Sequence, residues 1–355
     1  MDQELQKLLL DEYATIRDAI ACIDSNGAFI ALVVDPQRRL QGTVTDGDVR
    51  RAMLANLDLD TPVTELLVRQ RALDEDRPIP LTAPVGTPAS ELVALMRRYD
   101  VRQIPLVDVG GRVHGVAVLD ELIDDERLPL RAVVMAGGFG LRLGALTEET
   151  PKPMLPVGDR PLLERIIDQL REAGIHHVNL TTHYRSETIA GHFGDGSNFG
   201  VEIEYVSEER PLGTAGALGL VDADEPILVM NGDILTRVDF RAMHRFHDEH
   251  AAQMTVAVRP YEVHVPYGLV ELDGEQVSEI AEKPLVRAFV NAGIYLINPD
   301  VIKLVPAGEP LEMPELIQRL VADGRRVVGF PLREYWLDIG QIADYEQALV
   351  DVEGL

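Results

Sequence analysis

Hydrophobic positions in the second part of the chain alternate between short continuous runs and helical repeats. Residues 132–136 (AVVMA) are an apolar run typical of a buried strand, and residues 161–174 carry apolar side chains at helical spacing. Further strands are predicted at 178–183, 201–206, 226–233 and 254–260, and further helices at 186–193, 213–221 and 240–250. This alternation predicts an α/β domain over residues 131–355 with a mostly parallel, Rossmann-like sheet. Such sheets bind ligands beyond the carboxyl ends of their strands.

The first part of the chain repeats one order of elements. A helix, two strands and a second helix are expected in each copy, which predicts a duplicated α+β module over residues 1–125. The first copy has these elements at 12–24, 29–35, 40–46 and from Asp46 onward, and the second at 88–101, 102–109 and 112–122. An acidic helix end and Pro129 separate this module from the rest of the chain.

Composition narrows the class of protein. No apolar run approaches the roughly 20 residues that span a bilayer, and the first residues lack the pattern of a signal peptide, so a cytoplasmic protein without a membrane partner is expected. The net charge of −26 argues against nonspecific binding to nucleic acid. A phosphate ligand therefore needs a local cluster of positive charge. Only four lysines are present, and two of them, Lys152 and Lys283, lie in Lys-Pro segments. In a chain so poor in lysine this indicates that the compact charge of an ammonium group serves to bind phosphate at these positions.

The strand at 132–136 leads into the glycine-rich loop AGGFGLRLG. Ala136, Gly137, Gly138 and Gly140 leave backbone amides free to approach a triphosphate, and Arg142 adds a guanidinium. A dinucleotide-binding loop would pass directly into a helix. Here the prolines of LTEETPKPMLP forbid that helix, so the spacing of the glycines does not indicate a dinucleotide site.

The whole segment from Val133 to Pro156 resembles the signature of the sugar-1-phosphate nucleotidyltransferases, GGxGTRL…LT…PKPM. Further segments resemble that family in the same order: RPLGTAGAL (210–218), NGD (231–233), PYGLVELDG (266–274), EKP (282–284), VNAGIYLI (290–297) and WLDIG (336–340). The likeness covers residues 131–350. Leu141 is a departure, because the family has threonine or serine there, and one possible hydrogen bond to phosphate is lost.

The resemblance implies in-line attack of a sugar 1-phosphate on the α-phosphorus of a nucleoside triphosphate. It implies Arg142 and Lys152 as catalytic cations, and Asp233 and Asp338 as catalytic carboxylates that share Mg²⁺. Taken alone, either aspartate would be interpreted as the cap of a turn. The implied nucleotide-binding residues are Ala136, Gly137, Gly138, Gly140, Gly213 and Thr214, and the implied sugar-phosphate-binding residues are Gly268, Glu282, Lys283 and Asn291.

The sequence also predicts which nucleotide base and which sugar 1-phosphate the protein binds. Guanine presents two adjacent hydrogen-bond donors, and one carboxylate can accept from both, so GTP is predicted, with Glu208 as the residue that recognises the base. The alternative is that Glu208 and Glu209 are both solvated and contact no base. A uridylyl- or thymidylyltransferase is the alternative for the base. The combination of modules resembles the guanylyltransferases of legionaminic acid pathways, which implies glucosamine 1-phosphate, with mannose 1-phosphate and heptose 1-phosphate as alternatives. A catalytically silent nucleotide sensor is the alternative from another class.

The segment GTVTDGD, Gly42 to Asp48, resembles the pattern of cystathionine-β-synthase (CBS) domains. The resemblance implies that Thr45 and Asp48 bind a purine nucleotide effector; a helix cap or a dimerisation module is the alternative. In the second copy Val118 and Glu121 replace the threonine and the aspartate, which weakens a site there. CBS pairs commonly associate, so a homo-oligomer is expected.

Overall fold

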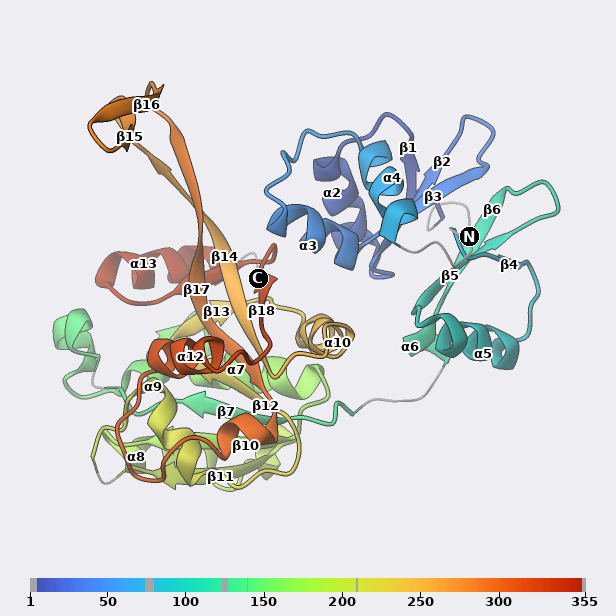
Figure 1. Cartoon of the computed structure of the whole chain (residues 1–355). Coiled ribbons are helices and arrows are strands. Elements are labelled where there is room, and N and C mark those ends of the chain that lie inside the picture. The colour runs from blue at the N-terminus through green and yellow to red at the C-terminus, as the bar shows by residue number, and fades with distance from the viewer. Residues whose placement is uncertain (1–4, 74–79, 123–126, 139, 209, 353–355) are drawn as a thin grey trace. The chain divides into compact units, whose positions relative to one another are not determined.

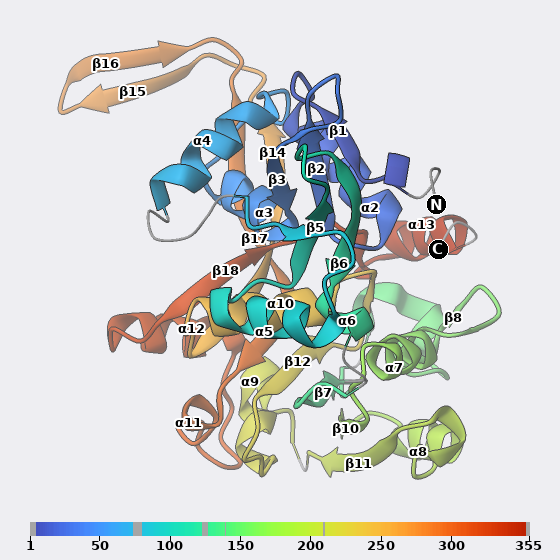
Figure 2. The same ribbon diagram turned by 90° about the vertical axis from the view of Figure 1, so that its right-hand side faces the viewer.

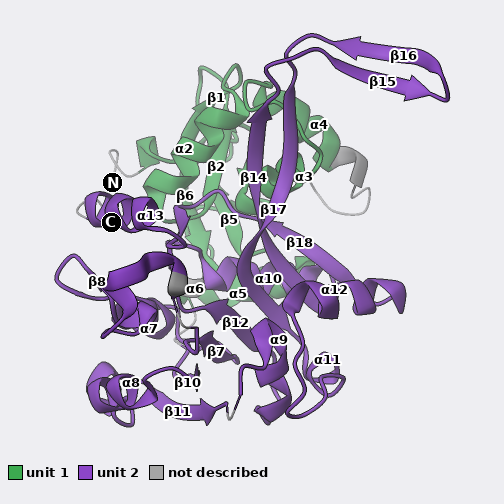
Figure 3. Cartoon of the chain, turned by 90° about the vertical axis from the view of Figure 1, so that its left-hand side faces the viewer, with its two compact units in different colours: residues 1–126 green, residues 127–355 purple. Residues whose placement is uncertain are grey.

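The computed structural model describes residues 5–73, 80–122, 127–138, 140–208 and 210–352, with the backbone alone for residues 71–73, 120, 121 and 141. The chain divides into two compact units, Met1–Glu126 and Arg127–Leu355 (Figure 3). None of the described helices is long and apolar enough to cross a membrane.

Unit 1 contains the two predicted copies, each built around a three-stranded sheet. The first sheet has the order β1-β2-β3 and the second the order β4-β5-β6. In both sheets the outer pair is parallel and the hairpin pair antiparallel. The first copy consists of β1 (Leu9–Asp11), α2 (Ile16–Asn26), β2 (Ile30–Val34), β3 (Leu40–Thr45), α3 (Asp46–Leu54) and α4 (Val63–Leu73), and the second of β4 (Ala83–Pro84), α5 (Ala89–Tyr99), β5 (Gln103–Val107), β6 (Val113–Val118) and α6 (Leu119–Leu122).

Unit 2 is organised by a seven-stranded sheet with the order β11-β10-β7-β12-β17-β14-β18. Its strands are β11 (Glu202–Ser207), β10 (His177–Thr182), β7 (Arg131–Met135), β12 (Ile227–Asn231), β17 (Leu285–Ile297), β14 (Met254–His264) and β18 (Val327–Pro331). Of these strands β17 alone runs antiparallel to its neighbours β12 and β14, while the other pairs are parallel. The prediction of an α/β domain with a mostly parallel sheet is therefore confirmed.

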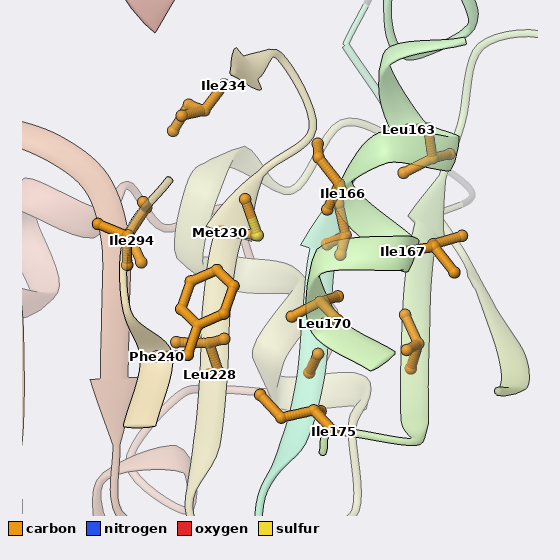
Figure 4. Close-up of a cluster of buried hydrophobic side chains, with 14 of the residues drawn as sticks. Leu163, Ile166, Ile167, Leu170, Ile175, Leu228, Met230, Ile234, Phe240 and Ile294 are labelled. Atoms are coloured by element: carbon orange, nitrogen blue, oxygen red, sulfur yellow. The ribbon is translucent and has the colours of Figure 1, made fainter. Parts of the chain in front are cut away.

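The longer helices α7 (Leu162–Glu172), α10 (Phe240–Glu249) and α12 (Met313–Ala322) of unit 2 each bury one apolar face. On α7, Leu163, Ile166, Ile167 and Leu170 are almost fully buried and face the strands (Figure 4). Cutting one such side chain to alanine would cost about 2–5 kcal/mol of stability. The other helices are α8 (Ser186–Phe193), α9 (Gly213–Gly216), α11 (Pro299–Ile302) and α13 (Ile342–Asp351), and 3-10 turns occupy Leu141–Thr147, Lys152–Met154, Ser197–Phe199 and Ala217–Leu220.

Short ladders lie outside the main sheet. β8 (Pro156–Val157) pairs with β9 (Arg160–Pro161), and β13 (Ile234–Thr236) pairs with β19 (Trp336–Asp338). Beyond the sheet β14 and β17 continue as a two-stranded ribbon, whose end carries β15 (Leu269–Asp273) and β16 (Gln276–Ala281) (Figures 1 and 2). The sequence prediction ended the strand at residue 260, whereas β14 runs on to His264, because its pairing with β17 continues past Pro260.

Candidate active site

Lys152 and Asp233 meet at the carboxyl ends of the central strands. Asp233 follows β12, whose neighbour β7 lies so close that the Gly232 amide donates to the Met135 carbonyl at 2.9 Å. Lys152 begins a 3-10 turn after Pro151 and is 8% exposed. Its Nζ lies 2.5 Å from Asp233 Oδ2. Asp233 Oδ1 is buried and accepts no hydrogen bond from any described residue.

Asp338 is brought next to Asp233 by the pairing of β13 with β19. Ile234 lies opposite Asp338 in this ladder, and the Ile339 amide donates to the Asp233 carbonyl at 3.0 Å. Asp338 is exposed at the end of β19, yet partial desolvation of its carboxyl raises its pKa, and the charge of Asp233 raises it further, while Lys152 and Arg142 act in the opposite direction. Four predicted charged groups therefore act on one another at a single site.

The two aspartates fit a Mg²⁺ ion. Magnesium takes oxygen ligands and often binds through one or two carboxylates, with waters and substrate phosphates completing its shell. Asp233 Oδ1, buried and without a donor among the described residues, is the kind of atom that a cation would satisfy. The described residues contain no group of three or more His, Cys, Asp or Glu side chains that could hold a metal by themselves. Any ion here would therefore depend on the substrate phosphates.

The glycine-rich loop lies against these groups. Gly140 has a φ of +66°, and a Cβ atom there would lie 2.8 Å from Thr147 Cγ2 and 3.2 Å from Lys152 Cβ, so a larger residue would strain the backbone and clash. A Cβ atom on Gly138 would meet no described atom within 4 Å, which leaves its backbone open to a ligand. The Ala136 amide is used within the sheet, donating to the Thr181 carbonyl at 3.0 Å.

The segment after the loop is a 3-10 turn, Leu141–Thr147, kinked at Gly144. The helix of a dinucleotide-binding fold is absent from this described segment, as the prolines predict. Thr147, which the sequence did not single out, holds the loop through its hydroxyl, which lies 2.9 Å from the Gly140 carbonyl. The side chain of Leu141, the one departure from the signature, lies outside the described part of the chain.

Glu208 lies at the end of β11, beside the loop. Its Oε2 accepts a hydrogen bond from the Leu212 amide at 2.9 Å, and its Oε1 lies 3.3 Å from the position of a Cβ atom on Gly137. His183, which the sequence analysis missed, packs against Gly137 and bonds through Nδ1 to the Glu208 carbonyl at 2.8 Å. One carboxylate oxygen of Glu208 therefore orders the following loop, and the other faces the glycines. Glu209 lies outside the described residues.

Gly213 and Thr214 are both held against residues 311–313. The Thr214 hydroxyl donates to Glu312 Oε2 and accepts from the Met313 amide, each at 2.8 Å, so both of its hydrogen-bonding directions are used within the protein. Gly213 has a φ of +76°, and a Cβ atom there would lie 2.7 Å from the Leu311 carbonyl oxygen. The segment is therefore fixed against residues 311–313, because the Thr214 amide also donates to Glu312 Oε2 at 3.2 Å and the Ala215 and Gly216 amides donate to the Leu311 carbonyl.

Asn291 lines a cavity of about 120 Å³ next to Asp338. Its Nδ2 donates to Tyr295 Oη at 2.8 Å and its Oδ1 accepts from the Gly293 amide at 3.0 Å. Trp336, which the sequence analysis did not select, forms part of the same wall. The full lining is Asn231, Ile234, Asn291, Ala292, Gly293, Tyr295, Trp336 and Asp338. Amides, a carboxylate and aromatic rings are groups that suit a sugar ring.

Gly268, Glu282 and Lys283 are not brought to this cavity. They lie in the segments that join β14 to β15 and β16 to β17, where a Cβ atom on Gly268 would be 3.2 Å from Glu282 Oε2. Figure 1 shows β15 and β16 at the outer end of the ribbon. From Leu285 to Asn291 the extended strand covers about 20 Å at roughly 3.3 Å per residue. The prediction of one four-residue site is therefore not met, because β14 and β17 stay paired as far as His264 and Leu285 and hold the ribbon away from the sheet.

Comparison with known proteins decides the family. The nucleotidyl transferase family model matches residues 131–354. The chain belongs to the nucleotidyl transferase family. CBS domain models match residues 7–55 and 76–125, so the predicted resemblance to a nucleotidyltransferase preceded by a CBS pair is confirmed.

Relatives of this nucleotidyl transferase include mannose-1-phosphate guanylyltransferases. That of Mycobacterium tuberculosis is 35% identical over 230 residues, covering 62% of this chain and 64% of the relative. A probable mannose-1-phosphate guanylyltransferase of Oryza sativa is 33% identical, covering 61% of this chain and 63% of the relative. The fold is shared with a putative glucose-1-phosphate thymidylyltransferase of Bacillus anthracis, at a TM-score of 0.53, 24% identity, and coverage of 64% of this chain and 96% of that one. It is also shared with HddC from Yersinia pseudotuberculosis complexed with GMP-PN, at a TM-score of 0.50, 22% identity, and coverage of 63% of this chain and 100% of that one.

In the CBS module of this nucleotidyl transferase, Thr45 and Asp48 begin α3 as a capping box. Asp48 Oδ2 accepts from the Thr45 amide and from the Thr45 hydroxyl, at 2.8 and 2.6 Å, and Oδ1 accepts from Arg51 at 2.6 Å. The helix cap, one of the alternatives from the sequence, is thus present. A cavity of about 290 Å³ lies beside it, lined by Asp48, Arg51, Ala52, Leu57, Leu66, Arg69 and Gln70. Gln70 Oε1 is buried and accepts no hydrogen bond from a described residue.

Proposed function

We propose that this chain transfers GMP from GTP to a sugar 1-phosphate and releases pyrophosphate. The observation that carries the proposal is the meeting of Lys152, Asp233 and Asp338 beside the glycine loop, since these groups can neutralise a triphosphate during phosphoryl transfer. The names of the guanylyltransferase relatives support the guanylyl group.

The chemistry needs positioning more than proton transfer. A phosphate oxygen of the sugar 1-phosphate attacks the α-phosphorus of GTP, a new P–O bond forms, and the bond to the leaving pyrophosphate breaks with its electron pair. The nucleophile is already an anion, so no general base is required. Lys152 would hold the attacking phosphate near the α-phosphate, and Arg142 would bind the departing charge. Asp233 and Asp338 would hold Mg²⁺, which when bound supplies charge neutralisation to the phosphates.

The base assignment rests on Glu208. Its Oε1 faces the glycine loop, where it can accept from the two donors of guanine, while Oε2 is committed to Leu212. In a Glu208→Gln variant the side-chain oxygen can still accept from the Leu212 amide, while the side-chain NH₂ group takes the place of Oε1. A donor then faces the base where the carboxylate offered an acceptor. We expect this variant to lose preference for GTP over UTP or dTTP in direct competition. An unchanged preference would assign Glu208 to ordering of the loop alone.

Mannose 1-phosphate is the first acceptor to test. The motif resemblance favoured glucosamine 1-phosphate, but the curated relatives reported above are named for mannose 1-phosphate. Heptose 1-phosphate stays in the panel. The described lining of the cavity contains no lysine or arginine, so we propose that Lys283, together with Glu282 and Gly268, reaches the sugar phosphate when the ribbon bends at the bulge between Val256 and Val258.

The test is release of pyrophosphate by the full chain with GTP, Mg²⁺ and each of the three sugar 1-phosphates. Product mass identifies the sugar, and the Asp233→Asn variant is the matched background. Release with at least one sugar, absent in the variant, is the expected result. Absence of release with every sugar and with GTP, UTP and dTTP alike would overturn the proposal.

We further propose that the CBS module binds a purine nucleotide in the 290 Å³ cavity beside Asp48. Its apolar floor would contact a base, Gln70 Oε1 would accept from it, and Arg51 and Arg69 would meet the phosphate. Calorimetry with AMP and ATP on the full chain tests this, with Gln70→Met, which removes the acceptor, and Arg69→Met as the variants expected to weaken binding. Equal binding by wild type and both variants would count against this cavity.

A further inference from the structure

Arg259 lies on β14 immediately after the bulge between Val256 and Val258, where the ribbon leaves the sheet. Its neighbour Val258 pairs with Asn291, one of the residues that line the cavity. The Arg259 side chain contacts β19 rather than pointing away from the protein. Its Nη1 donates to the Trp336 carbonyl at 2.6 Å, and its guanidinium carbon lies 5.4 Å from the centroid of the Trp336 ring.

Trp336 is held by a third contact. Its Nε1 donates to the Ala292 carbonyl at 2.8 Å, on the strand that carries Asn291. The indole N–H is thus fixed by β17. The Arg259 guanidinium contacts both the indole ring and the backbone carbonyl of Trp336. Because Trp336 lines the cavity with Asn291 and Asp338, any rotation of the indole would change the shape of that cavity.

We infer that Arg259 is a positioning residue, which holds Trp336 as one wall of the sugar cavity and thereby sets the affinity for the sugar 1-phosphate. The inference rests on the proposed function of that cavity. A planar guanidinium suits this position because it can lie over an aromatic ring and donate in its own plane at the same time, which an ammonium cannot do.

The carboxylates do not depend on Arg259. Asp338 is aligned by its ladder opposite Ile234, and the Ile339 amide donates to the Asp233 carbonyl. Loss of Arg259 should therefore disturb the wall of the cavity and leave the metal-binding pair in place. This separation predicts an effect on KM for the sugar 1-phosphate and little effect on kcat or on KM for GTP.

The experiment compares Arg259→Met and Arg259→Lys with Arg287→Met. Arg287 is a matched control, since it lies on the paired strand of the same ribbon, is half-exposed, and forms an ion pair with Glu262 at 3.0 Å. With mannose 1-phosphate and glucosamine 1-phosphate as probes, Arg259→Met should raise KM for the sugar about tenfold, equivalent to about 1.4 kcal/mol. Arg259→Lys should recover only part of the loss, and Arg287→Met should behave as wild type.

A second readout does not need turnover. Trp336 is the single tryptophan of the chain, so fluorescence excited at wavelengths that tyrosine does not absorb reports on this position alone. Arg259→Met should lower the fluorescence anisotropy of the indole and shift its emission, while Arg287→Met should change neither.

The outcomes separate this inference from the proposed function. If wild type turns over no sugar 1-phosphate, the proposed function fails, whatever the fluorescence shows. If wild type is active but Arg259→Met leaves KM for the sugar and the anisotropy unchanged, the inference is overturned. An equal rise of KM for GTP and for the sugar, or the same rise in Arg287→Met, would also overturn it, because it would indicate a general disturbance of the fold.

Discussion

Asp48 in unit 1 and Asp233 in unit 2 both come shortly after a strand, β3 and β12, yet their carboxylates are used differently. Asp48 has both oxygens occupied, by the amide and hydroxyl of Thr45 and by Arg51. Asp233 has one oxygen at 2.5 Å from Lys152 and the other buried without a partner among the described residues. A saturated carboxylate stabilises a helix end, whereas an unsaturated, buried one costs free energy and so indicates a ligand that is expected to satisfy it.

The strongest test of this comparison replaces Asp233 by asparagine. Loss of a metal-binding carboxylate should lower kcat by at least about 10³-fold, which corresponds to about 4 kcal/mol of transition-state stabilisation. Pyrophosphate release at saturating Mg²⁺ measures it. The control is Asp48→Asn, which removes a more deeply buried carboxylate from unit 1, with a side chain 6% exposed against 24% for Asp233, and should leave kcat within about twofold. Comparable losses in the two variants would contradict the distinction.

A slightly smaller effect is expected for Lys152. Replacing its ammonium by methionine removes the cation that faces Asp233 and the reacting phosphates, and should lower kcat by about 10²- to 10³-fold. Lys152→Arg should stay well below wild type, because a planar guanidinium cannot take the place of a compact charge in a buried position. Full activity in the arginine variant would show that only the sign of the charge matters there.

Substitution of Asp338 should lower activity without lowering stability. Partial desolvation and the neighbouring Asp233 raise its pKa, so the ionised side chain is somewhat less favourable in the folded state at neutral pH. Asp338→Asn should lower kcat by about 10²-fold and yet raise Tm at pH 7.5 by no more than about 1 °C, because solvent screens the charge of this exposed residue.

The sign of the pH dependence follows from the same shift. The folded-state pKa lies above the unfolded value of 3.8, so the folded state gains stability from this group as the pH falls through the raised pKa. The difference in Tm between Asp338→Asn and wild type should therefore shrink as the pH is lowered, while kcat of wild type falls over that range. A constant difference in Tm would rule out the raised pKa.

The smallest effect concerns the cap in unit 1. Thr45→Ala should cost about 1 kcal/mol of stability through loss of the capping box and leave turnover unchanged, as differential scanning calorimetry and the pyrophosphate assay would show. Thr15, which begins α2 with the same capping box, provides the matched variant Thr15→Ala. If Thr45 also contacts an effector, only Thr45→Ala should weaken binding of AMP. Equal binding in both variants would leave Thr45 with the cap alone.

Prediction from sequence succeeded where the deciding interactions are local. The runs of apolar residues gave the strands of the central sheet, and α7 follows its helical spacing because the side chains that share a face lie within a few residues of one another. The glycine loop was recognisable for the same reason, since Gly140 needs a positive φ and close approach to Thr147 within one short segment.

Prediction fell short where partners are distant in the sequence. The motifs placed Thr214 in a nucleotide-binding segment, but they did not show that its hydroxyl bonds to Glu312 and Met313, about 100 residues further along the chain. Trp336 lay within a recognised segment but was not selected, and His183 was missed, because their partners, Ala292 and Glu208, lie on or directly after other strands. The motifs likewise gave the order of Glu282, Lys283 and Asn291 but not the straightness of the ribbon that separates them.

The sequence by itself determined the alternation of strands and helices, the glycine loop that lacks a following helix, and the set of charged residues available for phosphate chemistry. These depend on periodicity, glycine and proline, which act over a few residues. Only the tertiary structure decided which charges meet. Lys152 and Asp233 are 81 residues apart, and Asp338 joins them only because β19 pairs with β13. Strand pairing and burial fix such contacts, and they also determine which carboxylate is saturated and which is left to bind a ligand.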